Sequence, residues 1–210
     1  MEFFTIFSIS VLAAIVAKTL YDGQINRFFR RFVKDSKIIL VVSQGGTCRA
    51  PMATLIMGQL IKIKRPEFKG VKFIACGIGP TTEKFASYAA RRVVHELFGK
   101  DLLKNWHPKQ VTQGLINEAE LILAMDRGQM NDKIFPPDRT ILFKEFFGLH
   151  GDVKDPFPDG RDDKTVSRYR GCANEIKFIV EEKFQFLEEF LCPSSRLSKK
   201  ITMHDHRTQN

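Results

Sequence analysis

The sequence predicts an α/β fold, a three-layer sandwich built around a four-stranded parallel sheet. The apolar run at residues 37–42, Lys-Ile-Ile-Leu-Val-Val, is typical of a strand that is buried on both faces. Further apolar runs alternate with segments of helical spacing, as right-handed β-α-β units require. The 210 residues, 43% of them hydrophobic, suffice for one such domain with additional terminal segments.

The predicted elements follow this alternation along the chain. Strands are expected at residues 37–42, 71–76, 121–125 and 140–143, and helices at residues 51–63, 85–98 and 166–191. Ligands of parallel sheets bind beyond the carboxyl ends of the strands, at the point where the strand order reverses. The loop after the first strand is therefore the first place to look for a site.

The positive charge lies mainly outside this domain. The net charge is +9, and residues 1–37, 38–191 and 192–210 each contribute a third of it. No basic stripe interleaved with aromatic residues is present, which argues against nucleic-acid binding. Basic chain ends suit an anionic membrane surface better.

An uncharged run at residues 3–17 predicts a membrane anchor, and it extends to Tyr21 if Lys18 reaches out to the interface. A cleaved signal peptide is one alternative, although the run is preceded by Glu2 rather than by basic residues. A buried or interfacial helix is another. Basic residues follow the run, so the positive-inside rule predicts a single-pass protein whose domain faces the cytoplasm.

The chain is thus expected to have four parts. Residues 1–22 are the anchor (or signal peptide), 23–36 a basic linker, 37–191 the domain, and 192–210 a basic disordered tail. The four cysteines have no metal-ligand or C-x-x-C spacing, so we expect reduced thiols, no metal site and no cofactor.

The loop at residues 43–49 predicts an oxyanion site. Its glycines let successive N–H groups point inward, and the following helix adds the positive end of its dipole. Arg49 supplies a planar fork of donors that suits phosphate. The expected phosphate-binding residues are Gln44, Gly45, Gly46, Thr47, Cys48 and Arg49. The alternative is an ordinary strand-to-helix turn with an exposed arginine.

This loop resembles the phosphate loop of low molecular weight protein tyrosine phosphatases, in which a cysteine, five residues and an arginine precede Ser-Pro-Met-Ala. Residues 48–53, Cys-Arg-Ala-Pro-Met-Ala, match that run at all but one position. Further similar segments follow in order at residues 75–77, 107–112, 118–126 and 153–157. The resemblance covers about residues 37–191 and implies the flavodoxin-like fold of the phosphotyrosine phosphatase I type.

The resemblance also implies a mechanism. In the family a thiolate attacks phosphorus, loop amides and an arginine hold the phosphate oxygens, and an aspartic acid protonates the leaving phenol. Carried over to this sequence, Arg49 is the phosphate clamp, Asp155 is the general acid and base, and Phe157 packs beside the substrate ring. Without the resemblance, Asp155 and Pro156 would be read as an ordinary turn.

The sequence departs from the family at the nucleophile. Ser43 stands at the cysteine position, Gly46 replaces an asparagine, and Ala50 replaces a serine. A serine hydroxyl is a weak nucleophile unless a base is adjacent, whereas a thiol in such a loop ionises readily. Cys48 adjoins Arg49 and lacks the required spacing. In the family, that second cysteine forms a protective disulfide with the nucleophile, which Ser43 rules out here.

These departures favour a pseudophosphatase that binds phosphotyrosine proteins or another phosphate monoester without hydrolysing them. It is expected to be tethered to the membrane through residues 3–21. One alternative is an active tyrosine phosphatase that uses Arg49 and Asp155. A second is a membrane scaffold with a vestigial loop. A third, an arsenate reductase on the same fold, would need nucleophilic cysteines that this loop lacks.

Overall fold

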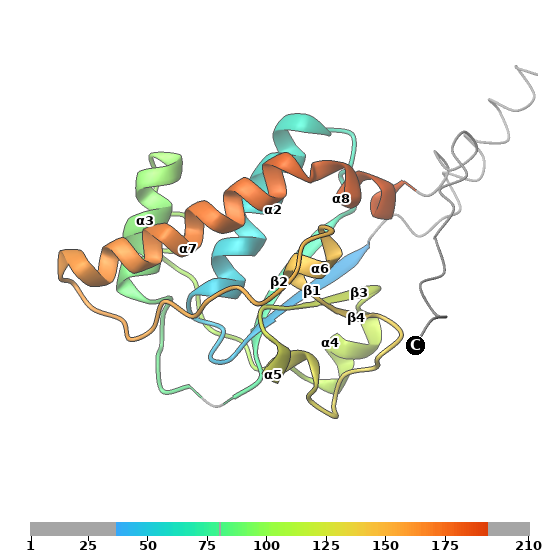
Figure 1. Cartoon of the computed structure of the whole chain (residues 1–210), viewed down its shortest axis with the longest axis horizontal. Helices are drawn as coiled ribbons and strands as arrows, with labels where there is room; N and C mark the ends of the chain where they lie inside the picture. Colours follow the sequence, from blue (N-terminus) through green and yellow to red (C-terminus); the bar gives the residue numbers. More distant parts are fainter. Residues whose placement is uncertain (1–36, 80, 193–210) are drawn as a thin grey trace, which may run out of the picture. The chain divides into compact units, whose positions relative to one another are not determined.

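The structure is a computed structural model that describes residues 37–79 and 81–192. One sheet of four parallel strands lies at its centre, in the order β2-β1-β3-β4 (Figure 1). The strands are β1 (Ile38–Ser43), β2 (Lys72–Gly77), β3 (Leu121–Ala124) and β4 (Thr140–Leu142). The predicted four-stranded parallel sheet is confirmed.

The central position of β1 explains its unbroken apolar sequence. Leu40 is paired with Ile74 of β2 on one side and with Ile122 of β3 on the other. Helices cover both faces of the sheet, so successive side chains of β1 are buried whichever way they point.

Helices of unequal size form the outer layers (Figure 1). The larger core lies on the face covered by α2 (Arg49–Lys64), α3 (Tyr88–Phe98), α7 (Asp163–Glu182) and α8 (Phe184–Leu191). The smaller core includes side chains of α4 (Gln113–Glu118) and α5 (Arg127–Met130) on the opposite face. The three-layer sandwich is therefore confirmed.

The predicted boundaries need several corrections. The single helix expected at residues 166–191 is two helices, because Lys183 has φ −113° and ψ 24° and interrupts the helix between α7 and α8. Apolar side chains recur at helical spacing on both sides of this break, so periodicity alone does not reveal it. The strand expected at 140–143 ends at Leu142, because Phe143 begins α6 (Phe143–Phe146). The helix expected from residue 85 begins at Tyr88.

The predicted anchor, linker and all but the first residue of the predicted tail lie outside the described residues. Within residues 37–79 and 81–192, no helix combines the length and the apolar character that a membrane crossing requires.

Candidate functional site

The loop between β1 and α2 lies where the strand order reverses. After β1 the chain forms β2, which pairs with one edge of β1, and it then forms β3, which pairs with the other edge. Ser43 is the last residue of β1, and Arg49 is the first residue of α2. Residues 43–49, named here the amide loop, thus occupy the switch point at which parallel sheets bind ligands.

The carbonyl oxygens of the amide loop are hydrogen-bonded to surrounding segments. The oxygen of Ser43 accepts from the Ile78 N–H at 3.1 Å, and that of Gln44 from the Gly79 N–H at 2.9 Å. The Thr47 oxygen accepts from the Ser87 N–H at 3.0 Å, and the Gly46 oxygen from the Trp106 indole at 3.3 Å. By contrast, the backbone N–H groups of residues 44–48 have no acceptor within the described part of the chain. This arrangement leaves a row of amide donors for an anion.

Close backbone contact holds the middle of the loop against the end of β2. Gly46 has φ +66°, and a Cβ atom at this position would lie 2.6 Å from the backbone nitrogen of Gly77. A Cβ atom on Gly77 would in turn lie 2.7 Å from the carbonyl carbon of Gly45. Both Gly46 and Gly77 therefore lack the space for a side chain, and Gly46 also has a left-handed backbone that favours glycine.

Replacing Gly46 with alanine is expected to lower the free energy of unfolding by about 2–3 kcal/mol, because the left-handed backbone and the contact with Gly77 both disfavour a side chain. Gly99 is a matched control, since it also has φ +66° but would place a Cβ atom in open space. Gly99→Ala should cost about 1 kcal/mol. Urea unfolding of both variants measures the difference, and equal losses would contradict the contact argument.

Arg49 is buried, with its guanidinium held by three acceptors. Nη1 donates to Asp126 Oδ2 at 2.8 Å and to the Val153 carbonyl at 3.0 Å. Nη2 donates to Asp155 Oδ2 at 2.6 Å. The Nε atom is buried and has no hydrogen-bond partner among the described residues. The structure thus brings the predicted site residues Arg49 and Asp155 together, and Asp155 contacts one arm of the fork that was expected to clamp phosphate.

Asp126 belongs to this site but was not among the predicted site residues. It follows β3 directly and caps α5, where its carboxylate and the Gln129 side chain each bond the other's backbone N–H. The signal that could have found it is its position, because the carboxyl ends of β1 and β3 meet at the same edge of the sheet. Asp126 thus holds Nη1 of Arg49, whereas Asp155 holds Nη2.

Asp155 lies at the start of a loop that is tied to two helices. Its Oδ1 accepts from the Phe157 N–H at 3.1 Å, and its Oδ2 accepts from Arg49. Arg168 of α7 donates to the carbonyl oxygens of Pro156 and Pro158. The Phe157 side chain is 73% exposed, so it is available to a substrate ring. Each carboxylate oxygen of Asp155 thus accepts one hydrogen bond and keeps a lone pair that can take part in other contacts.

The nucleophile position carries no activating partner. The Ser43 hydroxyl is buried and has no hydrogen-bond partner among the described residues, so no adjacent base removes its proton. Burial, followed by the charge of Asp155, raises the pKa of the Cys48 thiol to about 11. Burial also raises the pKa of Cys76 to about 11 and that of Cys172 to about 12. These three thiols therefore stay protonated at neutral pH and do not replace the missing thiolate.

Comparisons with known proteins bear on this geometry. A sequence model described as low molecular weight phosphotyrosine protein phosphatase matches residues 38–191. A protein-arginine-phosphatase from Bacillus subtilis (strain 168) is 32% identical over 158 residues, which cover 69% of this chain and 92% of that protein. The crystal structure of a low molecular weight protein tyrosine phosphatase from T. tengcongensis is 27% identical with a TM-score of 0.61, covering 71% of this chain and 99% of the other.

A third similar structure is the YwlE arginine phosphatase in a mutant form in which serine replaces a cysteine and the active-site serine is phosphorylated. It is 26% identical to this chain with a TM-score of 0.58, and the match covers 72% of this chain and 96% of the other. This chain is therefore similar over nearly the whole length of the relatives, and its additional residues lie outside the shared domain.

Proposed function

The chain belongs to the low molecular weight phosphotyrosine protein phosphatase family, and we propose that it binds phosphate groups on protein side chains at the amide loop and hydrolyses them slowly or not at all. The observation that carries this proposal is the combination of intact anion donors with an unactivated Ser43. The amide donors of residues 44–48 and the buried Arg49 suit a tetrahedral oxyanion. The serine hydroxyl lacks the base that an efficient attack on phosphorus needs.

Two classes of phosphorylated side chain fit the family. Relatives of this chain are named protein-arginine-phosphatases and protein tyrosine phosphatases, so phosphoarginine stands beside the phosphotyrosine expected from the sequence. The exposed ring of Phe157, two residues after Asp155, would favour an aromatic or planar group next to the phosphate. The proposal includes attachment to a membrane through residues 3–21, with the domain on the cytoplasmic side.

A second candidate function is a single phosphoryl transfer that stops at Ser43. It is favoured by the related arginine phosphatase in which an active-site serine, introduced in place of cysteine, is phosphorylated. In such a step the Ser43 oxygen forms a bond to phosphorus while the bond from phosphorus to the leaving group breaks. The hydroxyl proton ends on the leaving group. When water attacks the phosphoryl group, a serine alkoxide leaves less readily than a cysteine thiolate, so the protein would keep the phosphate.

The proposal is tested with the full chain and two peptides, one carrying phosphotyrosine and one carrying phosphoarginine. Calorimetry measures binding, a colorimetric assay measures released phosphate, and intact-protein mass detects a phosphoryl group on the protein. Binding of either peptide without steady phosphate release is the expected result, and Arg49→Lys should weaken it about tenfold because lysine keeps the charge but loses the planar fork. Sustained release would identify an active phosphatase, absence of binding would favour the scaffold, and stoichiometric phosphorylation at Ser43 would establish the second candidate.

A further inference from the structure

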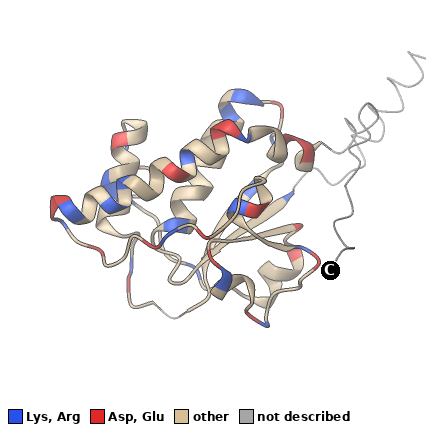
Figure 2. Cartoon of the chain, in the orientation of Figure 1, with Lys and Arg blue, Asp and Glu red and all other residues tan. Residues whose placement is uncertain are grey.

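One end of the domain carries positive charge that no acidic side chain neutralises. The helix α2 runs back from the carboxyl end of β1 to the start of β2, so its last turn lies at the amino ends of the strands. This turn is basic in Figure 2. Three exposed lysines, Lys62, Lys69 and Lys72, lie on the last turn of α2 and the segment that leads into β2. None of them forms an ion pair within the described structure.

Three acidic residues near this end pair with other basic residues. Arg65 pairs with Glu67 at 2.5 Å and with Glu188 of α8 at 2.7 Å. Lys37 pairs with Glu120 at 3.8 Å. The three lysines named above take part in none of these pairs.

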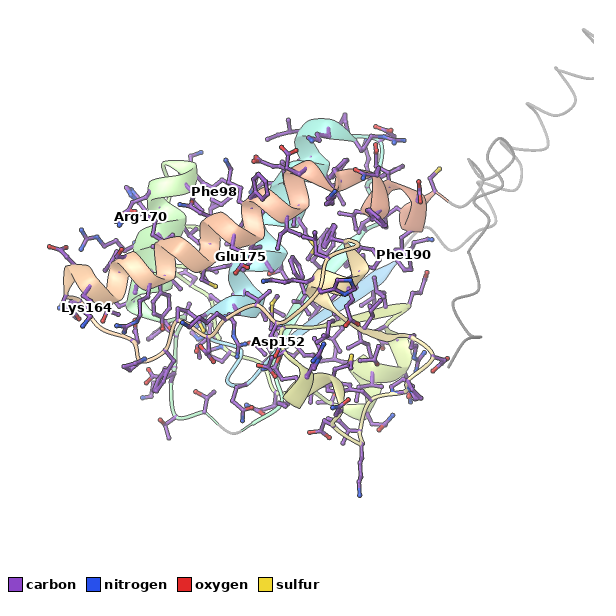
Figure 3. All side chains as sticks on the ribbon, viewed as in Figure 1. Phe98, Asp152, Lys164, Arg170, Glu175 and Phe190 are labelled. Atoms are coloured by element: carbon purple, nitrogen blue, oxygen red, sulfur yellow. The ribbon has the colours of Figure 1, made fainter. Side chains whose placement is uncertain are left out.

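Basic residues elsewhere on the domain are often paired. Arg170 of α7, labelled in Figure 3, contacts both oxygens of Glu96, at 2.8 and 3.0 Å. Arg91 donates twice to Asp101, at 3.0 and 2.7 Å. The unpaired lysines at the end of α2 are instead free to attract an external polyanion.

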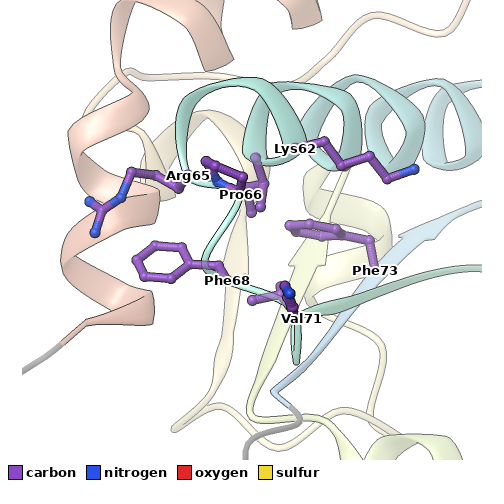
Figure 4. Close-up of a pocket in the computed structure, with 9 residues that line it drawn as sticks. Lys62, Arg65, Pro66, Phe68, Val71 and Phe73 are labelled. Atoms are coloured by element: carbon purple, nitrogen blue, oxygen red, sulfur yellow. The ribbon is translucent and has the colours of Figure 1, made fainter.

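An apolar pocket opens among these lysines (Figure 4). It has a volume of about 330 Å³ and lies between the end of α2 and the start of β2. Phe68, Val71 and Phe73 contribute its apolar wall, and no acidic residue lines it. Lys62 and Lys69 are among the lining residues, so the pocket combines apolar surface with cationic side chains. Beside it, the side chain of Ile63 is 74% exposed.

The described part of the chain begins at the same end of the domain. Lys37, the first described residue, precedes β1 and therefore lies at the same edge of the sheet as the end of α2. The predicted linker of residues 23–36 can span at most about 50 Å when fully extended. A bilayer that holds the predicted anchor would therefore lie within reach of this edge.

From these observations we infer that the basic end of the domain, defined by Lys62, Lys69, Lys72 and the adjoining pocket, docks on an anionic lipid bilayer. The lysines contact lipid phosphates, the pocket receives part of a lipid headgroup, and Ile63 enters the interface. The amide loop lies at the carboxyl ends of the strands, whereas the basic end lies at their amino ends. Docking therefore leaves the loop open to the aqueous phase. The inference does not depend on the chemistry at Ser43.

The test uses residues 37–192, so that the predicted anchor cannot carry the binding. Related structures that match 96–99% of their own length to this domain indicate that it folds alone. Sedimentation with phosphatidylcholine vesicles is compared with sedimentation with vesicles that also contain phosphatidylserine. We expect binding to the anionic vesicles alone, with loss of that binding at high salt. Each lysine near a membrane surface contributes about fivefold, so changing all three lysines to glutamine should weaken partitioning on the order of 100-fold.

The matched control changes three other exposed lysines to glutamine, Lys109, Lys133 and Lys164, which lie away from this end. Lys164, labelled in Figure 3, lies near the start of α7. All variants change exposed side chains, and circular dichroism checks that each is folded. The inference is wrong if the parent domain ignores anionic vesicles or if both triple variants lose binding equally. A concentration-dependent dimer that the first triple variant disrupts would assign this face to a second copy and also overturn it.

Discussion

Replacing Ser43 with cysteine is expected to raise the hydrolysis of p-nitrophenyl phosphate on the order of 10³-fold or more over the parent chain. The new thiol would lie at the end of β1, at the focus of the amide donors and the dipole of α2. These groups and Arg49 stabilise a thiolate, whereas the parent hydroxyl has no base to activate it. Initial rates at neutral pH, with vanadate as inhibitor, measure the change.

A Ser43→Ala chain is the control for this experiment, since it removes the hydroxyl and adds no nucleophile. It should match the parent in both turnover and vanadate binding. A parent that is already as active as the cysteine variant would show that another group performs the chemistry. A cysteine variant that binds vanadate but stays inert would move the defect to Gly46 or Ala50.

Replacing Arg49 with methionine is expected to lower the free energy of unfolding by about 3 kcal/mol and to abolish anion binding. The guanidinium is 3% exposed and is the shared partner of Asp126 and Asp155. Without it the two carboxylates remain near each other with no cation between them. The side chains of Asp126 and Asp155 are 27% and 41% exposed, so solvent screens the repulsion between them. The loss of stability is therefore expected at the lower end of the range for broken buried pairs. Urea unfolding at neutral pH gives the value.

Arg65→Met is the matched control, because Arg65 also joins two carboxylates, those of Glu67 and Glu188, but is 30% exposed. Its loss should cost about 1 kcal/mol or less. Adding Asp155→Asn to Arg49→Met should restore part of the lost stability, since one of the two uncompensated charges is then removed. Equal destabilisation by the two arginine changes, or no recovery in the double variant, would contradict the assigned role of Arg49.

The sequence was sufficient to predict the sheet because a strand that is buried on both faces consists of consecutive apolar residues. The apolar run of β1 follows from its pairing with β2 and β3, and the helical spacing of α2 follows from its contact with the larger core. The break at Lys183 could not be predicted, because a helix that bends around a core keeps its apolar spacing on both sides. The short helices α4, α5 and α6 have six residues or fewer, too few for a period to appear.

The candidate site was predictable where its residues are adjacent in the chain and less so where they are not. Residues 43–49 form one loop, so their glycines and arginine could be interpreted together. Trp106 and Asp126 act on that loop from segments 60 and 77 residues away, through the Gly46 carbonyl and the Arg49 guanidinium. Their roles depend on which strand ends meet at the sheet edge. The pairing of Arg49 with Asp155 likewise depends on a tertiary contact that no local pattern encodes.

The contact between Gly46 and Gly77 also bears on how this chain could change over evolutionary time. Active members that the sequence resembles carry asparagine where Gly46 stands, and any side chain there would place its Cβ atom 2.6 Å from the backbone of Gly77. Introducing asparagine alone would therefore place its side chain against the backbone of Gly77. A side chain at position 46 consequently cannot be gained by one substitution unless the backbone at Gly77 moves with it.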